Sequence, residues 1–408
     1  MTREEVLALD AADSLAFARE RFALPDGTIY LDGNSLGALP AGTPGHVARV
    51  VEEQWGRDLI ASWNRHDWIG LPQRVGARIA GLVGAGEDEV IACDSTSVNL
   101  FKLLSAALPL RADSSDLVIE DAGFPTDRYI AAEVAARAGR SLRAVPRADL
   151  ASAIDERTAL VLLTHVDYRG GGIADIAAIT AAAHAAGALV LWDLSHSAGA
   201  VAVDLARARA DMAVGCGYKY LNGGPGAPAW LYVRRELQDA LATPIPGWLG
   251  HAAPFAFTQD YRPAPGLSRM LCGTPPVLAM AALEHGLMQF EGVPLPALFA
   301  KGRALGDLAI WLVEDRCAGH GFILASPRDG ASRGSHVAFA HPHAHALCQA
   351  LIARGVVGDF RAPDILRLGF APLYLRLVEV WDAVEILGQI LDSGEWDQPR
   401  FHQRDRVT

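Results

Sequence analysis

Short apolar runs alternate with alanine-rich stretches between residues 90 and 233. The runs are continuous rather than alternating, which is typical of strands buried on both faces, and the stretches between them have the pattern of amphipathic crossover helices. The predicted strands are residues 116–120, 158–166, 188–194, 211–217 and 229–233, and the clearest helices are 130–140 and 175–187. The pattern predicts an α/β domain with a mostly parallel sheet and helices on both faces.

The pattern changes after Pro275 and Pro276. Helical periodicity then covers residues 277–290, 295–316 and 375–391, with an antiparallel strand expected near 334–341. This indicates a smaller α+β domain at the C-terminal end.

The start of the chain has turn chemistry in YLDGNSLGALP, residues 30–40, rather than helical period. We expect it to pack on the small domain and over an active site. The expected division is residues 1–45 for this N-terminal segment, 46–280 for a large cofactor-binding domain and 281–408 for the small domain.

Composition narrows the possible classes of protein. Of the 408 residues, 51% are apolar and 20% are charged. The chain contains no run of eighteen uncharged apolar residues, the length needed to span a bilayer. The net charge of −11 argues against a protein that follows a phosphate backbone. The five cysteines are scattered, and the first residues lack the pattern of a secretory signal. We expect a soluble cytoplasmic protein with reduced cysteines that binds neither nucleic acid nor membrane.

Candidate chemistry lies at the ends of two predicted strands. Asp193 ends one of them, and Lys219 lies beyond the next in the glycine-rich turn GCGYKYLNGGPGAP. Carboxyl ends of parallel strands face the crevice where such sheets bind ligands. A strand-end acid and lysine are what pyridoxal phosphate requires, one for its ring nitrogen and one for a Schiff base. Taken singly, Asp193 could cap a helix and Lys219 could be a solvated loop lysine.

Two further segments suit the same cofactor. Thr96 and Ser97 precede an amphipathic helix, where hydroxyls and backbone N–H groups can bind a phosphate, although an ordinary capping box explains the segment equally well. Phe124 of FPTD could stack on the pyridine ring, and Asp127 could hydrogen-bond a ring substituent.

The chain contains, in this order, the motifs FPTD, WDLSHSAGA, GCGYKYLNGGPGAP, GWLGH and CGTPP. With them it resembles the kynureninase family over most of its length. That resemblance implies a pyridoxal-phosphate hydrolase of fold type I. It assigns Lys219 to the Schiff base, Asp193 to the ring nitrogen and Phe124 to stacking. The remaining cofactor contacts that it implies are Thr96, Ser97, Thr164, His196 and Tyr218, with Trp248 and Thr274 serving the partner subunit of a homodimer.

The resemblance also implies where the substrate binds. Arg367 would clamp the α-carboxylate through a bidentate pair, with Arg361 as a nearby rival. Asn34 and Ser35, with Trp63 or His66, would lie near the aryl end.

The implied reaction converts L-kynurenine, or its 3-hydroxy form, to an anthranilate and L-alanine in tryptophan catabolism, the kynurenine pathway or NAD biosynthesis. Lys219 would move the Cα proton, Asp193 would maintain the electron sink and Tyr218 would relay protons. Because this fold hosts several reactions, a cysteine desulfurase using Cys317 or Cys348 remains an alternative, as does an aminotransferase. A non-catalytic binding protein is a third reading, and loss of Lys219 or Asp193 would have favoured it.

Two other motifs give weaker evidence of function. GLVGAGED, residues 81–88, follows a helical pattern and is interpreted as a helix stop rather than a dinucleotide loop. The alternating His341, His343 and His345 lack neighbouring carboxylates or cysteines, so an exposed strand or turn is favoured over a metal site.

Overall fold

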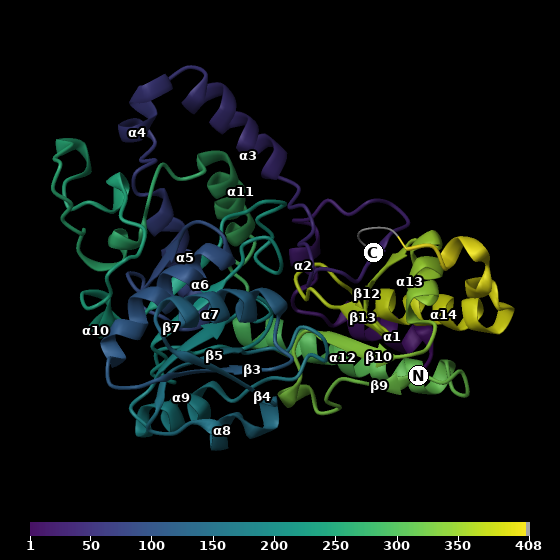
Figure 1. Ribbon diagram of the computed structural model, residues 1–408. Helices are drawn as coiled ribbons and strands as arrows, with labels where there is room; N and C mark the ends of the chain where they lie inside the picture. The colour runs from purple at the N-terminus through teal and green to yellow at the C-terminus, as the bar shows by residue number, and fades with distance from the viewer. Residues whose placement is uncertain (405–408) are drawn as a thin grey trace.

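A computed structural model describes residues 1–404 and shows a large α/β domain beside a smaller one (Figure 1). The large domain has one seven-stranded sheet in the order β2-β8-β7-β6-β5-β3-β4, and only β8 runs antiparallel to its neighbours. The strands are β2 (Val90–Ala92), β3 (Asp116–Glu120), β4 (Ser141–Val145), β5 (Thr158–Thr164), β6 (Leu189–Asp193), β7 (Met212–Gly215) and β8 (Trp230–Val233). The predicted mostly parallel sheet is confirmed.

Helices cover both faces of this sheet, which explains why its strands β3 and β5 are buried along their whole length (Figure 1). One face carries α5 (Leu71–Val83), α6 (Thr96–Ala107) and α7 (Pro125–Arg137), and the other carries α8 (Leu150–Ala153) and α9 (Ile176–Ala185). The short α10 (Arg235–Gln238) follows β8. Helix α7 begins earlier than predicted because Pro125 suits the first helical position. Helix α5 ends at Gly84 with φ 63°, so the interpretation of GLVGAGED as a helix stop is confirmed.

The small domain has an antiparallel sheet in the order β12-β13-β10-β9. Its strands are β9 (Ile323–Leu324), β10 (His336–Ala340), β12 (Asp359–Arg361) and β13 (Ile365–Gly369), and its helices are α12 (Leu295–Arg316), α13 (Ala344–Ala353) and α14 (Leu377–Ser393). The antiparallel strand predicted near 334–341 is thus confirmed as β10.

The N-terminal segment contacts the small domain at several points. Helix α1 (Arg3–Ala11) packs on α14, whose first N–H groups donate to the Asp10 carboxylate at 2.7 and 2.9 Å. The short α2 (Ala16–Arg19) pairs Arg19 with Glu379 of α14. Strand β1 (Ile29–Tyr30) pairs in parallel with β11 (Val356–Val357).

The boundary expected at residue 280 falls inside α11 (Val277–Met288), a helix that contacts both α5 and α3 (Thr43–Arg49). A cut through a helix would break its backbone hydrogen bonds, so we propose the turn after α11 as the domain limit. The division of the chain otherwise stays a prediction.

An arm projects from the large domain (Figure 1). It consists of α3, a π-helical turn from Val50 to Trp55 and α4 (Ser62–Arg65). The arm exposes large apolar side chains, with Trp55 58% and Ile60 80% exposed. Single exposed apolar residues are common, whereas this projection carries several of them together.

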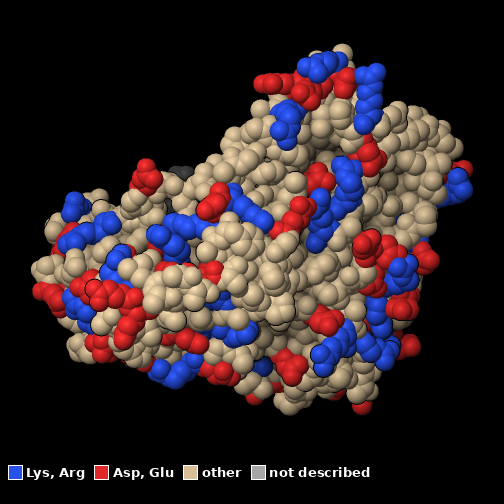
Figure 2. All heavy atoms as spheres, turned by 180° about the vertical axis from the view of Figure 1, so that it is seen from behind, with Lys and Arg blue, Asp and Glu red and all other residues tan. Residues whose placement is uncertain are grey.

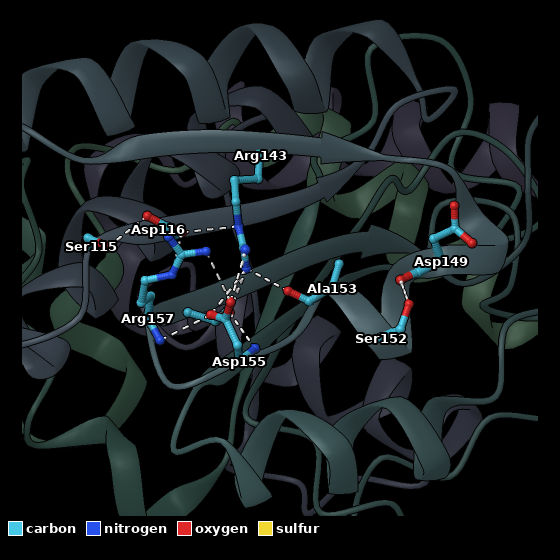
Figure 3. A network of polar contacts seen from close by, with 9 residues as sticks. Ser115, Asp116, Arg143, Asp149, Ser152, Ala153, Asp155 and Arg157 are labelled. Atoms are coloured by element: carbon cyan, nitrogen blue, oxygen red, sulfur yellow. Dashed lines mark hydrogen bonds and ion pairs between the residues drawn. The ribbon is translucent and has the colours of Figure 1, made fainter.

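Charged side chains of both signs are interspersed on the face shown in Figure 2. At the amino ends of β3 to β5, Arg143 contacts Asp116 and Asp155, each at 3.1 Å, and Asp155 also holds Arg157 (Figure 3). This network joins strands at the end of the sheet opposite to Thr164 and Asp193, and we interpret it as structural. Within residues 1–404, no helix has both the length and the apolar character needed to cross a bilayer.

Candidate active site

A cavity opens at the carboxyl ends of the parallel strands, as the position of Asp193 and Lys219 predicted. Strand β5 ends there at Thr164 and β6 at Asp193, while α6 and α7 begin at its rim. The cavity is lined by Ser95, Thr96, Ser97, Phe124, Thr126, Asp127, Thr164, Tyr168, Asp193, Ser195, His196, Tyr218 and Lys219. The structure therefore brings nine of the predicted cofactor residues into one site.

Lysines in this chain are few, and only one of them is at this cavity. The chain has three, of which Lys102 pairs with Asp94, and Lys301 pairs with Asp13 at 2.7 Å. Lys219 has no such ion pair, and its Nζ lies about 6 Å from the ring centroids of Phe124 and Tyr218, at 6.0 and 5.9 Å. Burial lowers the pKa of Lys219 and outweighs the opposing effects of Cys216 and Asp193. This amine is the one most easily deprotonated to act as a nucleophile.

Two buried carboxylates face each other beside this amine. Asp193 and Asp127 are both 3% exposed, and burial raises the pKa of each, with the Asp193 charge adding to the effect on Asp127. The backbone N–H of Ser195 donates to Asp193 at 2.8 Å, whereas neither oxygen of Asp127 has a hydrogen-bond partner. A protonated pyridine nitrogen would donate its N–H to one acid, and a hydroxyl substituent of the ring would donate to the other.

The start of α6 suits a phosphate group. Ser95 is the N-cap, and Thr96 and Ser97 occupy the first two helical positions, where backbone N–H groups have no partner within the helix. The Thr164 hydroxyl and His196 Nδ1, on other walls of the cavity, are also buried without a partner. These free polar groups and the two acids fit pyridoxal phosphate.

Aromatic side chains complete the cavity. Phe124 is 42% exposed and makes an edge contact with Tyr168 at 5.4 Å between centroids, which leaves its face available for stacking. Burial, followed by the effects of Cys216 and Asp193, raises the pKa of Tyr218, so its hydroxyl stays protonated at neutral pH and can donate a proton or a hydrogen bond.

Arg367 is fully buried on β13 and forms a bidentate pair with Asp359, with Nε to Oδ1 at 2.8 Å. It also donates to the carbonyl oxygen of Tyr168, which links it to the cavity wall. Ser35 Oγ accepts from Arg367 at 3.3 Å, and the Asn34 amide oxygen, turned toward the guanidinium, accepts at 3.0 Å. The predicted substrate residues Asn34, Ser35 and Arg367 thus lie together.

The rival arginine joins the same cluster. Arg361 Nη2 contacts Asp359 at 2.8 Å and is 37% exposed, and its Nε has no partner. Both guanidinium groups lower the pKa of Lys219, so both act on the cavity electrostatically.

The N-terminal segment crosses directly beside the lysine. The Gly37 backbone N–H donates to the Tyr218 carbonyl oxygen at 2.8 Å, and a Cβ on Gly37 would overlap the carbonyl of Lys219. Only glycine allows this close approach, which carries Asn34 and Ser35 from the lysine turn to Arg367.

Three predicted residues lie away from this cavity in the described chain. Trp63 packs edge-on against Trp68 and Trp248, with centroids 6.1 and 6.0 Å apart, and Trp248 continues to Phe255 at 5.7 Å. We call these four residues the aromatic ladder. Neither Trp63, Trp248 nor the exposed Thr274 is among the residues that line the cavity. Trp63 was expected near the substrate, and its contact with Trp248 joins it to a residue expected to serve the partner.

Sequence reasoning missed Tyr168, Asp359 and His336. Both ring nitrogens of His336 are buried without a partner, and its ring packs on His196 with centroids 5.5 Å apart. A histidine directly before the apolar run VAFA, residues 337–340, was the available signal for it. Nothing in the sequence around Asp359 distinguished it from a surface acid.

An exposed strand or turn was expected at the histidine motif, and this is confirmed for His343, which lies in an exposed turn. It is wrong for His341, which is buried, and for His345, which lies in α13. His343 stacks on Trp396 at 4.3 Å between centroids, and His341 Nε2 contacts the His320 carbonyl at 2.9 Å. Within residues 1–404, no group of three or more His, Cys, Asp or Glu side chains is arranged to hold a metal ion.

The fold and the site together define a pyridoxal-phosphate enzyme of fold type I. Among solved structures, the apo structure of a cysteine desulfurase from Thermococcus onnurineus NA1 matches with a TM-score of 0.79 at 18% identity, covering 93% of this chain and 98% of that one. A variant of C-DES with glycine covalently linked to the PLP cofactor also matches at 0.79 and 18%, covering 91% and 98%. At this identity the likeness shows the fold alone.

Sequence comparison gives the family. Residues 298–387 match the family model of the kynureninase C-terminal domain. Kynureninases from Pseudomonas fluorescens and Burkholderia mallei (strain SAVP1) are each 51% identical over 414 residues, and one from Burkholderia pseudomallei (strain 1106a) is 50% identical, with 100% of both chains covered in each case. The chain belongs to the kynureninase family.

Proposed function

We propose that the cavity around Lys219 hydrolyses L-kynurenine to anthranilate and L-alanine, and that it also accepts the 3-hydroxy form. The enzyme is a pyridoxal-phosphate hydrolase that acts on a carbon–carbon bond, as its family membership establishes. The observation that supports this site is Lys219, a lysine without an ion pair that lies beside two buried acids, Asp193 at the end of β6 and Asp127 in the first turn of α7.

Pyridoxal phosphate, when bound, supplies an electron sink for the negative charge that builds up on the substrate. Lys219 would hold it covalently, Asp193 and Asp127 would hold the ring, and Phe124 would stack on it. Thr96, Ser97 and Tyr218 would bind its phosphate, and Thr164 and His196 would complete the contacts. The buried, partnerless atoms of Asp127, Thr164 and His196 support this assignment.

Proton transfer falls to Lys219 and Tyr218. A lysine amine with a lowered pKa can accept the Cα proton at neutral pH and return it later. Tyr218, with its raised pKa, would donate while water adds to the γ-carbonyl and the Cβ–Cγ bond breaks.

Arg367 would bind the substrate α-carboxylate, with Asn34 and Ser35 beside it. Its guanidinium is already held by Asp359 and Tyr168, so few of its donors are free for a ligand. Arg361, whose Nε is unpartnered, would supply the additional donor.

The desulfurase alternative is not favoured. A desulfurase cysteine must reach substrate from a mobile loop, whereas Cys317 ends α12 at 2% exposure and Cys348 is fully buried within α13. Burial raises the pKa of Cys317 to about 12, which leaves it a poor nucleophile.

We further propose a cytoplasmic homodimer in which Trp248 and Thr274 reach the partner's phosphate site. The exposed apolar side chains of the arm, and Phe255 and Phe257 at 54% and 72% exposure, support a covered surface here. Because Trp63 packs on Trp248, it would serve the partner's substrate pocket rather than its own.

The test follows anthranilate fluorescence after L-kynurenine is added to cofactor-loaded protein, with the Lys219→Ala variant as a control. We expect fluorescence to grow with the wild type only, and the visible absorbance band of the bound cofactor to be lost in the variant. A cofactor band without anthranilate would reject the substrate, and activity in the variant would reject Lys219.

A further inference from the structure

Lys102 is a charged side chain with no exposed surface, on α6 and six residues after Thr96. Its Nζ donates to the Asp94 carboxylate and, at 2.5 Å, to the Met270 carbonyl oxygen. Burial alone lowers the pKa of Lys102, but interactions with Cys93, Asp94 and Cys272 outweigh it and hold the pKa above its usual value. The side chain is therefore a buried ammonium with fixed acceptors.

The turn that Lys102 holds is poorly supported by local interactions. Asp94 has φ 51°, an unfavourable conformation for a residue with a Cβ. The N-cap bond from the Val98 N–H to Ser95 Oγ is long, at 3.4 Å. Asn99 holds the Cys93 carbonyl at 2.9 Å, one residue before the turn. At the turn itself, which sets the direction of the first N–H groups of α6, the Ala229 N–H holds the Asp94 carbonyl oxygen at 2.9 Å, and Lys102 holds the Asp94 side chain.

The second acceptor belongs to the segment that continues to Cys272 and Thr274. Gly247 packs against this segment so closely that a Cβ there would overlap the Cys272 carbonyl, and Trp248 follows directly. One ammonium thus joins the start of α6 to both segments that carry Trp248 and Thr274.

We propose that Lys102 is a positioning residue for the cofactor phosphate, because its ties to Asp94 and Met270 fix the backbone at the start of α6. This inference rests on the proposed assignment of Thr96 and Ser97 to that phosphate. If a residue acts only through the phosphate, its loss weakens the binding of pyridoxal phosphate. The binding of pyridoxal, which lacks the phosphate, then stays unchanged.

The experiment removes the ammonium with Lys102→Met and titrates cofactor-depleted protein with pyridoxal phosphate and, separately, with pyridoxal, following absorbance. We expect the Kd for pyridoxal phosphate to rise at least about tenfold and the Kd for pyridoxal to change less than about twofold. Lys301→Met is the matched control, because it breaks a buried ion pair with Asp13, away from the cavity. Both Kd values should stay unchanged in this control.

Equal weakening of both ligands, or of neither, would overturn the role of Lys102. If the wild type itself failed to prefer pyridoxal phosphate, the proposed phosphate site would fail and the inference with it. Should Lys102→Met not fold, Asp94→Asn removes the same ion pair at a position where the carboxylate is 29% exposed. The same selective loss is expected there, and a loss shared by both ligands contradicts the proposal.

Discussion

The main free-energy cost in this site is the burial of charged side chains. Asp127 and Asp193 are buried and Lys219 is half-buried beside them, and burial is the largest influence on the pKa of each. Uncompensated groups of this kind neutralise rather than stay ionised. A ligand that brings a cationic ring nitrogen allows both acids to carry charge again, so cofactor binding and their ionisation are thermodynamically linked.

Asp359 holds Arg367, the arginine proposed to bind the substrate. Replacing Asp359 tests whether substrate binding depends on this contact. In Asp359→Asn, Arg367 loses a buried charged partner, a change that costs roughly 3–5 kcal/mol in stability. We expect a lower Tm and a KM for kynurenine raised at least about tenfold, because the guanidinium is no longer fixed.

The matched control for that variant is Asp364→Asn. It removes an exposed ion pair with Arg169, at 44% and 41% exposure, and surface pairs contribute about 0–1 kcal/mol. The KM should stay at the wild-type value there. An unchanged KM in Asp359→Asn would contradict the positioning role.

Asp32 makes a separate prediction about pH. Burial first, and Asp359 next, raise its pKa to about 7. Between about pH 4 and 7 the folded protein holds a proton at this site that the unfolded chain has released, so the contribution of Asp32 to stability falls as pH rises through that window. Asp32→Asn cannot titrate, so the variant avoids this pH-dependent loss of unfolding free energy, which amounts to roughly a few kcal/mol. Its Tm relative to wild type should therefore be higher at pH 8 than at pH 4, and a constant difference would contradict the shift.

At the scale of elements, the site is made where strands end and helices begin. Strands β5 and β6 deliver Thr164 and Asp193 to one edge, and α6 and α7 deliver their first residues to the same edge. The N-terminal loop and the small-domain strands β12 and β13 enter from outside this pattern, and the loop passes the lysine turn at one glycine.

Gly37→Ala tests that crossing. The added methyl would overlap the Lys219 carbonyl and approach Asn222, so the loop or the lysine turn must move. We expect a shifted absorbance band for the bound cofactor and a kcat/KM lowered at least about tenfold.

Gly45→Ala is the control for that variant, because its Cβ would meet no atom within 4 Å and it lies in α3. It should fold with unchanged spectrum and activity. An unaltered spectrum in Gly37→Ala would show that the loop does not constrain Lys219.

The elements also explain what could be predicted from the sequence. Continuous apolar strands and the strand-end rule led to Asp193 and Lys219 without tertiary information. Asp359, Tyr168 and His336 were missed because their roles come from contacts between segments far apart in the chain. The packing of Trp63 on Trp248 was not predicted for the same reason, and the role of Trp63 near the substrate stays a prediction.

In the whole molecule, the predicted site residues fall into two groups at different places. One group, around Lys219, lines a single cavity in this chain. The other is the aromatic ladder with exposed Phe255 and Phe257, and it begins at Trp63 in α4 of the projecting arm. If both groups act on one substrate, two copies of the chain must meet, and each active site then contains residues from both.

Mixed dimers test this arrangement. Lys219→Ala and Trp248→Ala are each expected to be nearly inactive alone, but a hybrid of the two contains one site with Lys219 from one subunit and Trp248 from the other. After free exchange in an equal mixture, half of the dimers are hybrids, so about a quarter of all sites are intact. Anthranilate fluorescence should recover to about that fraction. A mixture of Lys219→Ala with Asp193→Ala is the control, because both changes affect the same cavity and no hybrid site is complete. No recovery in the first mixture would mean that Trp248 serves its own subunit. Recovery in the control would mean that Lys219 and Asp193 belong to different sites, and would contradict the single cavity.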